Sequence, residues 1–250
     1  MRILLTVEYD GTNYSGWQRQ KNAISVQQVL EEAIETATGT ATVVVGAGRT
    51  DAGVHAFAQC AHFDTKTSIP PDKIAYALNL VLPRDIRIRE SRKVSDHFHA
   101  RKSARGKHYR YVIYQAPHDC AINRDFCCHI RYGLNVEAMR QAAAYLKGTH
   151  DFASFCAAGS SVESTVRKIS DLDIQQIGEH IYIDVKGNGF LYNMVRIIVG
   201  TLLEVGSGRR SALSVAQILQ AKSRDAAGPT APAKGLFLIC VAYDHNLLLK

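Results

Sequence analysis

The first half of the chain alternates between apolar runs and polar breaks in a pattern that predicts four strands and two helices. Short runs rich in β-branched and aromatic residues predict strands at Ile3–Tyr9, Thr42–Ala47, His55–Asp64 and Ile86–Val94. Apolar residues spaced three and four apart predict helices at Val26–Thr38 and Asp72–Val81. Ser25 is a suitable N-cap for the first helix and Gly39 ends it, while Pro71 opens the second helix, where the first amides lack helical partners.

The second half repeats this order of elements. Strands are expected at Lys107–Tyr114, Val166–Gln175, His180–Lys186 and Gly235–Tyr243. Helices are expected at Val136–Leu146, capped by Asn135, and at Phe190–Val205. An α+β fold of two fused split-βαβ halves follows, divided into residues 1–104 and 105–250, with antiparallel sheets, helices on one side of each sheet and a central cleft lined by both halves. No sequence repeat accompanies the repeated element order.

Basic residues are clustered in the middle of the chain. Among 250 residues, 30 Lys and Arg against 23 Asp and Glu give a net charge of +7. The two clusters are Arg84, Arg87, Arg89, Arg92 and Lys93, and Arg101, Lys102, Arg105, Lys107 and Arg110. Because phosphate neutralisation releases counterions, these clusters favour a nucleic-acid partner. Membrane headgroups are the competing polyanion, although no basic amphipathic helix supports them, and a solvated basic surface is the alternative without a ligand.

Hydropathy and cysteine usage predict a cytoplasmic protein. No apolar run approaches the ~20 residues of a membrane span, and the first strand soon meets Glu8 and Asp10, unlike a signal peptide. The 6 cysteines are scattered without a Cys-x-x-Cys pair, which argues against a zinc site or a disulfide framework and suits a reducing compartment. The histidines include no helical His-x-x-x-His pair, so metal ligation is unsupported.

Residues 43–59, VVVGAGRTDAGVHAFAQ, present Asp51 in a glycine-rich loop. The segment begins like a dinucleotide-binding fingerprint, but Asp51 stands where that fingerprint needs a small residue, and its carboxylate would face the phosphates. No Gly-Lys-Ser/Thr follows, and strand-like residues come next, so the loop is expected to join two strands and bind no nucleotide. Glycines give a tight backbone and Arg49 favours an ionised carboxylate, which makes Asp51 a catalytic candidate; a turn-capping aspartate is the alternative.

His55 invites a Ser-His-Asp arrangement with Ser15 or Ser154. Nothing in the sequence brings these residues together, and no Gly-x-Ser-x-Gly elbow is present. A structural histidine is therefore the favoured interpretation.

Tyr109 and Arg196 are further candidates. The strand Lys107–Tyr114 places Tyr109, Tyr111 and Ile113 on one face, and a ring beside arginines can stack on a nucleobase, although core tyrosines are commoner. The apolar helix from Phe190 carries the cation Arg196. A buried guanidinium is costly unless it meets an anion, so Arg196 should pair with a carboxylate or phosphate, with Asp51 as the candidate; an arginine extending to solvent from the core edge is the alternative.

Together these motifs resemble the TruA family of transfer-RNA pseudouridine synthases along nearly the whole chain. The segments that carry the resemblance are Asp10–Gln18 (DGTNYSGWQ), Gly48–Ala56 (GRTDAGVHA), Tyr109–Tyr111 (YRY), Asp151–Phe155 (DFASF), Phe190–Gly200 and Ala233–Leu236 (AKGL). Any one alone is weak, but their order is specific. The segments Ala116–Arg131 and Ala157–Ser164 are the variable part.

The resemblance implies an enzyme that isomerises uridine to pseudouridine at positions 38, 39 and 40 of the tRNA anticodon stem-loop, as a homodimer without metal, cofactor or nucleotide. It also implies roles for individual residues. Asp51 is the catalytic aspartate, Arg49 helps to displace the target base, Tyr109 packs against the flipped uracil, and Arg196 pairs with Asp51. Candidate RNA contacts are Arg49, Thr50, Arg101, Lys102, Arg105, Lys107 and Arg110. A non-catalytic tRNA-binding or tRNA-folding protein that uses the same basic cleft is the alternative.

Overall fold

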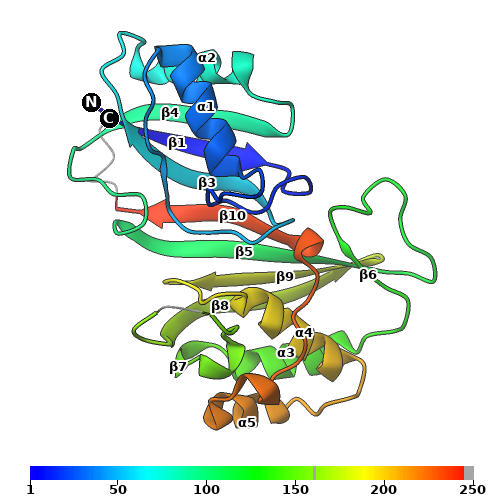
Figure 1. Cartoon of the computed structure of the whole chain (residues 1–250). Coiled ribbons are helices and arrows are strands. Elements are labelled where there is room, and N and C mark those ends of the chain that lie inside the picture. The colour runs from blue at the N-terminus through cyan, green and yellow to red at the C-terminus, as the bar shows by residue number, and fades with distance from the viewer. Residues whose placement is uncertain (160–161, 245–250) are drawn as a thin grey trace. The chain divides into compact units, whose positions relative to one another are not determined.

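The strands predicted for the first half form a sheet of order β4-β1-β3-β2 in the computed structural model, which describes residues 1–159 and 162–244 (Figure 1). The strands are β1 (Arg2–Tyr9), β2 (Val45–Gly46), β3 (His55–Asp64) and β4 (Ile86–Val94). β1 lies antiparallel between β3 and β4. β2 is shorter than predicted, because the Val44 amide donates to the Glu31 side chain and not to a neighbouring strand.

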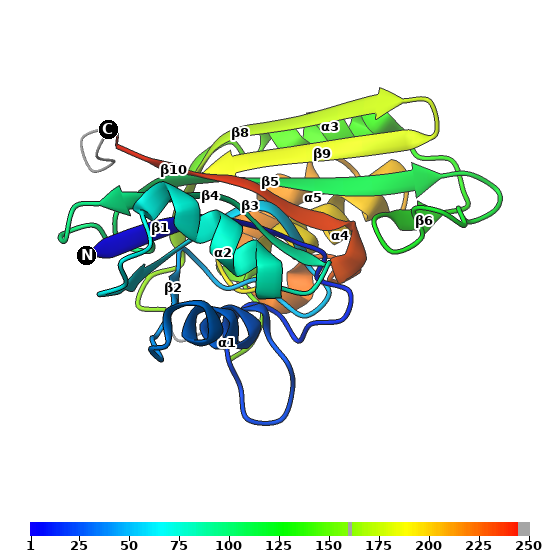
Figure 2. The same ribbon diagram turned by 90° about the horizontal axis from the view of Figure 1, so that it is seen from above.

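Two helices, α1 (Val26–Thr38) and α2 (Ile74–Val81), cover one face of this sheet (Figures 1 and 2). The predicted caps of α1 are confirmed, since Ser25 Oγ accepts from Gln28 N at 3.3 Å and Gly39 takes the left-handed φ of 71°. The predicted start of α2 is a short 3₁₀ turn, Pro71–Lys73, that leads into the helix. Local sequence signals therefore set these helix ends.

In the other part of the chain the strand order is β5-β9-β8-β7, and β6 pairs in parallel with β5. Its strands are β5 (Ala104–Gln115), β6 (Cys128–Ile130), β7 (Gly148–Asp151), β8 (Val166–Ile177) and β9 (His180–Gly187). The helices of this part are α3 (Val136–Ala144), α4 (Met194–Gly206) and α5 (Ser214–Ala221), and Figures 1 and 2 show α3 and α4 side by side on one face of the sheet. β6, β7 and α5 were not predicted, because each is too short for a clear period.

α4 begins four residues later than predicted, and its burial confirms its apolar pattern. Asn193 takes a left-handed φ of 58°, so Phe190–Asn193 cannot belong to the same helix. Every residue of α4 is buried except Arg196 and Glu204. Asn135 caps α3 as predicted, with its side chain accepting from Ala138 N at 3.0 Å.

The closing strand β10 (Leu236–Tyr243) lies with the first part of the chain. It runs parallel to β3, with Phe237 opposite His55 and Leu238 opposite Ala56. Met1–Lys107 and the chain from Phe237 onward form one compact unit, and His108–Leu236 form the other. The expected division into residues 1–104 and 105–250 placed this strand in the second half. Its partner on β3 lies far away in the sequence, so the pairing has no local signal.

The predicted α+β class is confirmed: both units combine mostly antiparallel strands with a few helices. Within residues 1–159 and 162–244, no helix is long and apolar enough to cross a membrane. The cysteines Cys60, Cys120, Cys127, Cys128, Cys156 and Cys240 are free thiols.

His62 on β3 is buried beside Phe98, and its Nδ1 accepts from Ala100 N at 3.1 Å. Burial, followed by the charges of Arg2 and His99, lowers its pKa to about 4 from 6.5. The unfolded chain therefore binds the proton more readily, and stability should fall as pH drops from about 6.5 towards about 4. Urea unfolding should show this loss in the parent and a smaller one in His62→Asn, whose amide oxygen can still accept from Ala100. Equal losses of stability in the parent and in His62→Asn would show that protonation of His62 is not the cause.

Candidate active site

Asp51 lies in the loop between β2 and β3, so the predicted connection of strand to strand is confirmed. The loop is tied at both ends: Ala47 N donates to Cys60 O at 2.7 Å, and Val54 N donates to Asp51 O at 3.1 Å. Gly53 takes a φ of 75°, a left-handed conformation that favours glycine. The Asp51 side chain is half-buried at this turn.

The Asp10–Gln18 motif packs against this loop and fixes its backbone. Trp17 N donates to Thr50 O at 3.1 Å, and Gly53 N donates to Tyr14 O at 3.3 Å. A β-carbon on Gly16 would lie 2.4 Å from Thr50 O, so only glycine allows this approach. The Asp10–Gln18 and Gly48–Ala56 motifs are therefore parts of one structure around Asp51.

Thr50 is buried, and its hydroxyl lies 2.7 Å from the hydroxyl of Tyr9 at the end of β1. Gln59 on β3 is also buried, and its Nε2 donates to Gly48 O at 2.9 Å. Tyr9 and Gln59 were not singled out from the sequence. A polar residue within the apolar alternation of β3 was the available signal for Gln59, because buried amides require partners. These contacts give Thr50 a role in supporting the loop.

His55 is held by structural contacts, as favoured from the sequence. Its Nδ1 accepts from Gly11 N at 3.0 Å, and its ring stacks on Phe237 with centroids 4.8 Å apart. The same Nδ1 lies 3.1 Å from Asp10 Oδ1, a contact that is an ion pair only when the ring is protonated. Ser154 donates to Ile218 O at 2.6 Å and accepts from Ser223 N at 2.9 Å, so its hydroxyl has a structural role too.

Gly11→Ala should destabilise the support of the Asp51 loop. A β-carbon at this position would lie 2.0 Å from Val54 O, a backbone atom that cannot rotate away. Overpacking of this kind costs about 1–3 kcal/mol or more. Gly133→Ala is the matched control, since nothing lies within 4 Å of its added β-carbon. Urea unfolding measures both variants, and equal stability of the two would show that the contact between Gly11 and Val54 is not tight.

Tyr109 and Arg196 belong to the other unit. Tyr109 is 7% exposed on β5 and meets Phe190 edge to face, with centroids 5.2 Å apart. The neighbouring Tyr111 is fully buried and donates to Pro232 O at 2.8 Å, so it is the core tyrosine of the pair. The predicted alternation of β5 is confirmed, because Tyr109, Tyr111 and Ile113 are its buried residues.

The Arg196 guanidinium is oriented by two contacts within its unit. Nε donates to Ala231 O at 2.7 Å, and Nη1 donates to Asn193 Oδ1 at 2.9 Å. Ala231 N in turn donates to Arg196 O at 3.0 Å, which fixes the segment before β10 to α4. The side chain is half-buried and does not simply extend to solvent.

The predicted RNA contacts differ in how much of their charge is already neutralised. Arg110 binds Asp184 through Nε at 3.0 Å and Nη2 at 3.0 Å, and Arg105 binds Asp244 at 2.7 Å. Exposed side chains without an ion pair to any described residue are Arg49, Arg101 and Lys102. These three are the better placed to meet phosphate.

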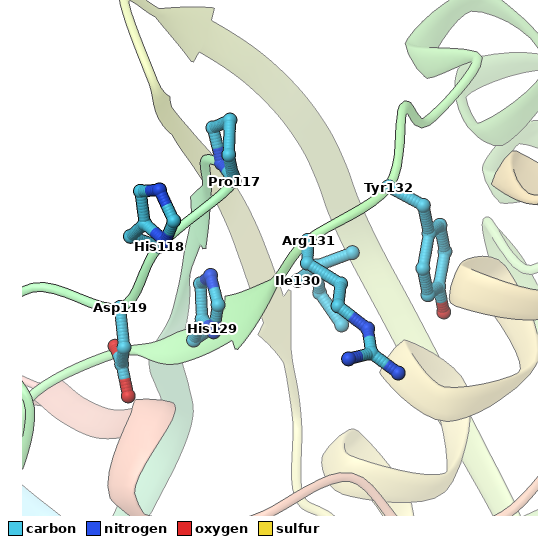
Figure 3. A pocket seen from close by; sticks show the side chains of 7 residues that line it. All are labelled: Pro117, His118, Asp119, His129, Ile130, Arg131 and Tyr132. Carbon is cyan, nitrogen blue, oxygen red and sulfur yellow. The ribbon is translucent and has the colours of Figure 1, made fainter.

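A hollow of about 470 Å³ lies in the second unit beside β6 (Figure 3). It is lined by Pro117, His118, Asp119, His129, Ile130, Arg131 and Tyr132, and therefore by none of the predicted site residues. Among the residues that the structure describes, no three His, Cys, Asp or Glu side chains come close enough to hold a metal ion. Ser160 and Ser161 of the variable Ala157–Ser164 segment lie outside the described residues.

Comparison with known proteins decides the family. Residues 5–101 and 142–244 match the family model described as tRNA pseudouridine synthase. The chain belongs to the tRNA pseudouridine synthase family. This confirms the resemblance, and the protein is an isomerase that acts on uridine in tRNA. The matched segments contain Asp51 and Arg196, whereas Lys107 and Tyr109 lie between them.

Relatives named tRNA pseudouridine synthase A are similar over nearly their full length. The protein of Thermoanaerobacter sp. (strain X514) is 52% identical over 96% of this chain and 99% of its own. That of Ruminiclostridium cellulolyticum is 51% identical over 97% and 99%, and that of Bacillus licheniformis 46% over 98% and 100%. The similarity to a solved Cbf5-Nop10-Gar1 complex is much weaker, with a TM-score of 0.40 at 12% identity over 82% of this chain and 45% of the other.

Proposed function

We propose that this tRNA pseudouridine synthase modifies uridines at positions 38, 39 and 40 of the anticodon stem-loop, as a cytoplasmic homodimer, with Asp51 as the nucleophile. The observation that carries the assignment of Asp51 is the fixed backbone around it. Three separate segments, the end of β1, the Asp10–Gln18 motif and β3, all hydrogen-bond to this one loop. A turn-capping aspartate would need no such support.

The reaction suits a single carboxylate. It breaks the bond between ribose C1′ and uracil N1 and forms one between C1′ and C5, while C5 loses a proton and N1 gains one. Atoms and electrons balance within the uridine, so neither an oxidant nor an energy source is consumed. The Asp51 carboxylate is able to attack as a nucleophile and afterwards to accept the C5 proton.

The target uridine must leave its stack before it can reach Asp51. Extrusion costs a few kcal/mol of stacking and pairing, and an inserted side chain with an aromatic receiving surface offsets that cost. Arg49, exposed two residues before Asp51, is the proposed inserted residue. Tyr109 is the proposed receiving surface, with its ring position fixed by Phe190.

Arg196 is the proposed counter-ion of Asp51. Its orientation by Ala231 and Asn193 supports this, because a guanidinium held at Nε and Nη1 presents its remaining donors in a fixed direction. Such a cation favours the ionised carboxylate that nucleophilic attack requires.

Mapping of pseudouridines in unmodified tRNA after incubation with the purified protein tests the proposal. Pseudouridine at the three anticodon stem-loop positions is expected without any added metal or nucleotide. Product at other positions would overturn the target assignment. Binding of tRNA without any product would favour the non-catalytic alternative.

A further inference from the structure

Lys107, near the start of β5, brings an amine directly onto the Asp51 loop. A β-carbon added to Gly48 would lie 2.3 Å from Lys107 Nζ, so the amine lies against the Gly48 backbone. The other side of Gly48 is fixed, because its carbonyl accepts from the buried Gln59 amide at 2.9 Å. The amine therefore lies three residues from Asp51 along a loop that has little freedom to move.

This amine has no counter-ion. Among residues 1–159 and 162–244, no carboxylate forms an ion pair with Lys107, and no acceptor hydrogen-bonds to it. Burial, reinforced by the charge of Arg101, lowers the pKa of Lys107 to about 8. The other charged residues of the surrounding segments are Arg49 and Asp51 on the loop, Lys102 on the turn before β5, and Arg105 on β5, which binds Asp244. None of them pairs with Lys107. An ammonium group in this position is unfavourable until an anion arrives.

We propose that Lys107 binds one backbone phosphate of the tRNA substrate beside the Asp51 loop. The partner is assigned as RNA on the basis of the proposed function. Phosphates are the anions that tRNA offers, and a lysine ammonium binds them as a compact charge without demanding a fork geometry. Arg49 on the same loop and Arg101, whose charge acts on Lys107, also lack carboxylate partners among the described residues, which suits a polyanion rather than a single carboxylate ligand.

The proposal predicts how tRNA affinity depends on pH. A bound phosphate stabilises the ammonium, so the pKa of Lys107 rises on binding. Binding is therefore strongest below about 8, where the free amine is already charged, and weakens as pH rises through the range where that charge is lost. Since tRNA phosphates stay ionised throughout, the change comes from the protein.

Equilibrium tRNA binding by three variants and a control tests this between about pH 7 and about pH 9. Lys107→Met should bind about tenfold more weakly at neutral pH, with a salt dependence shallower by about one phosphate contact and without the weakening at high pH. Lys107→Arg should keep tight binding at high pH, because its guanidinium does not deprotonate there. Gly48→Ala, which displaces the amine but retains its charge, should weaken binding in the same direction. Lys73→Met, which removes an exposed lysine on the far 3₁₀ turn, should bind like the parent.

Parent-like affinity of Lys107→Met, or the same pH dependence in Lys107→Met and the parent, would overturn the proposal. Should Lys107→Met fail to fold, Lys107→Arg and Gly48→Ala still decide it. The chemistry is read separately, from product formed by the parent and by Lys73→Met at saturating tRNA. If Lys107→Met binds tRNA like the parent and the parent forms product, only the phosphate site is refuted. If the parent forms no product, only the proposed function is refuted.

Discussion

Asp51→Asn is expected to abolish pseudouridine formation while tRNA binding stays within about tenfold of the parent, or about 1.4 kcal/mol. Asparagine has nearly the same shape, so the loop fixed by Thr50, Tyr14 and Val54 should keep its backbone contacts. What it lacks is the anionic oxygen that attacks and later accepts a proton. Product formed from unmodified tRNA and binding measured in parallel give the two quantities.

Asp72→Asn is the matched control for this experiment. Asp72 is an exposed aspartate that pairs with its neighbour Lys73 at 3.3 Å, so its loss should leave product formation unchanged. Equal yields of pseudouridine from Asp51→Asn and the parent would remove Asp51 from the reaction. A large loss of tRNA affinity in Asp51→Asn would instead assign the carboxylate to substrate binding.

Arg196→Met should both slow the reaction and move the onset of activity to higher pH. In the proposed pairing the guanidinium favours the anion that attacks, so activity that needs this anion should begin at a higher pH without it. Methionine fits the apolar surroundings of α4, although the contacts to Ala231 and Asn193 are lost. The measurement is the pH dependence of single-turnover product formation.

Arg210→Met is the control for a lost arginine in the same unit. Arg210 binds Glu204 at 2.5 Å at the end of α4, away from the proposed chemistry. Loss of the Arg210 side chain should lower stability and leave the pH profile of the reaction unchanged. An unchanged profile in Arg196→Met would show that Arg196 does not act on Asp51.

The predictable part of the fold was the part set by local periodicity. The helix α1, its two caps and the alternation of β5 follow from residues within a few positions of one another. The start of α4 was wrong, because the left-handed backbone of Asn193 carries no strong sequence signal. The place of β10 could not be read locally, since it depends on pairing with residues roughly 180 positions earlier in the chain.

The candidate site was likewise predictable only where the signal lies within a few residues. The strand-like residues on either side of the Asp51 loop correctly predicted a connection between two strands. The support from Tyr9 was not predictable, because it joins residues 41 positions apart through one buried hydroxyl pair. Thr50 was expected to touch RNA, and its burial instead explains why this position next to Asp51 needs a small hydroxyl side chain.

The late position of β10 has a consequence for biosynthesis. The ribosome makes residues 108–235 before the strand that pairs with His55 and Ala56, the two residues that follow the Asp51 loop. Until that strand emerges, only the first residues of β3 present an unpaired edge, beyond the part that pairs with β2, and such edges in nascent chains are prone to misassociate. A polypeptide released before Leu236 is made would leave this edge open, so synthesis of β10 and maturation of the loop region are coupled.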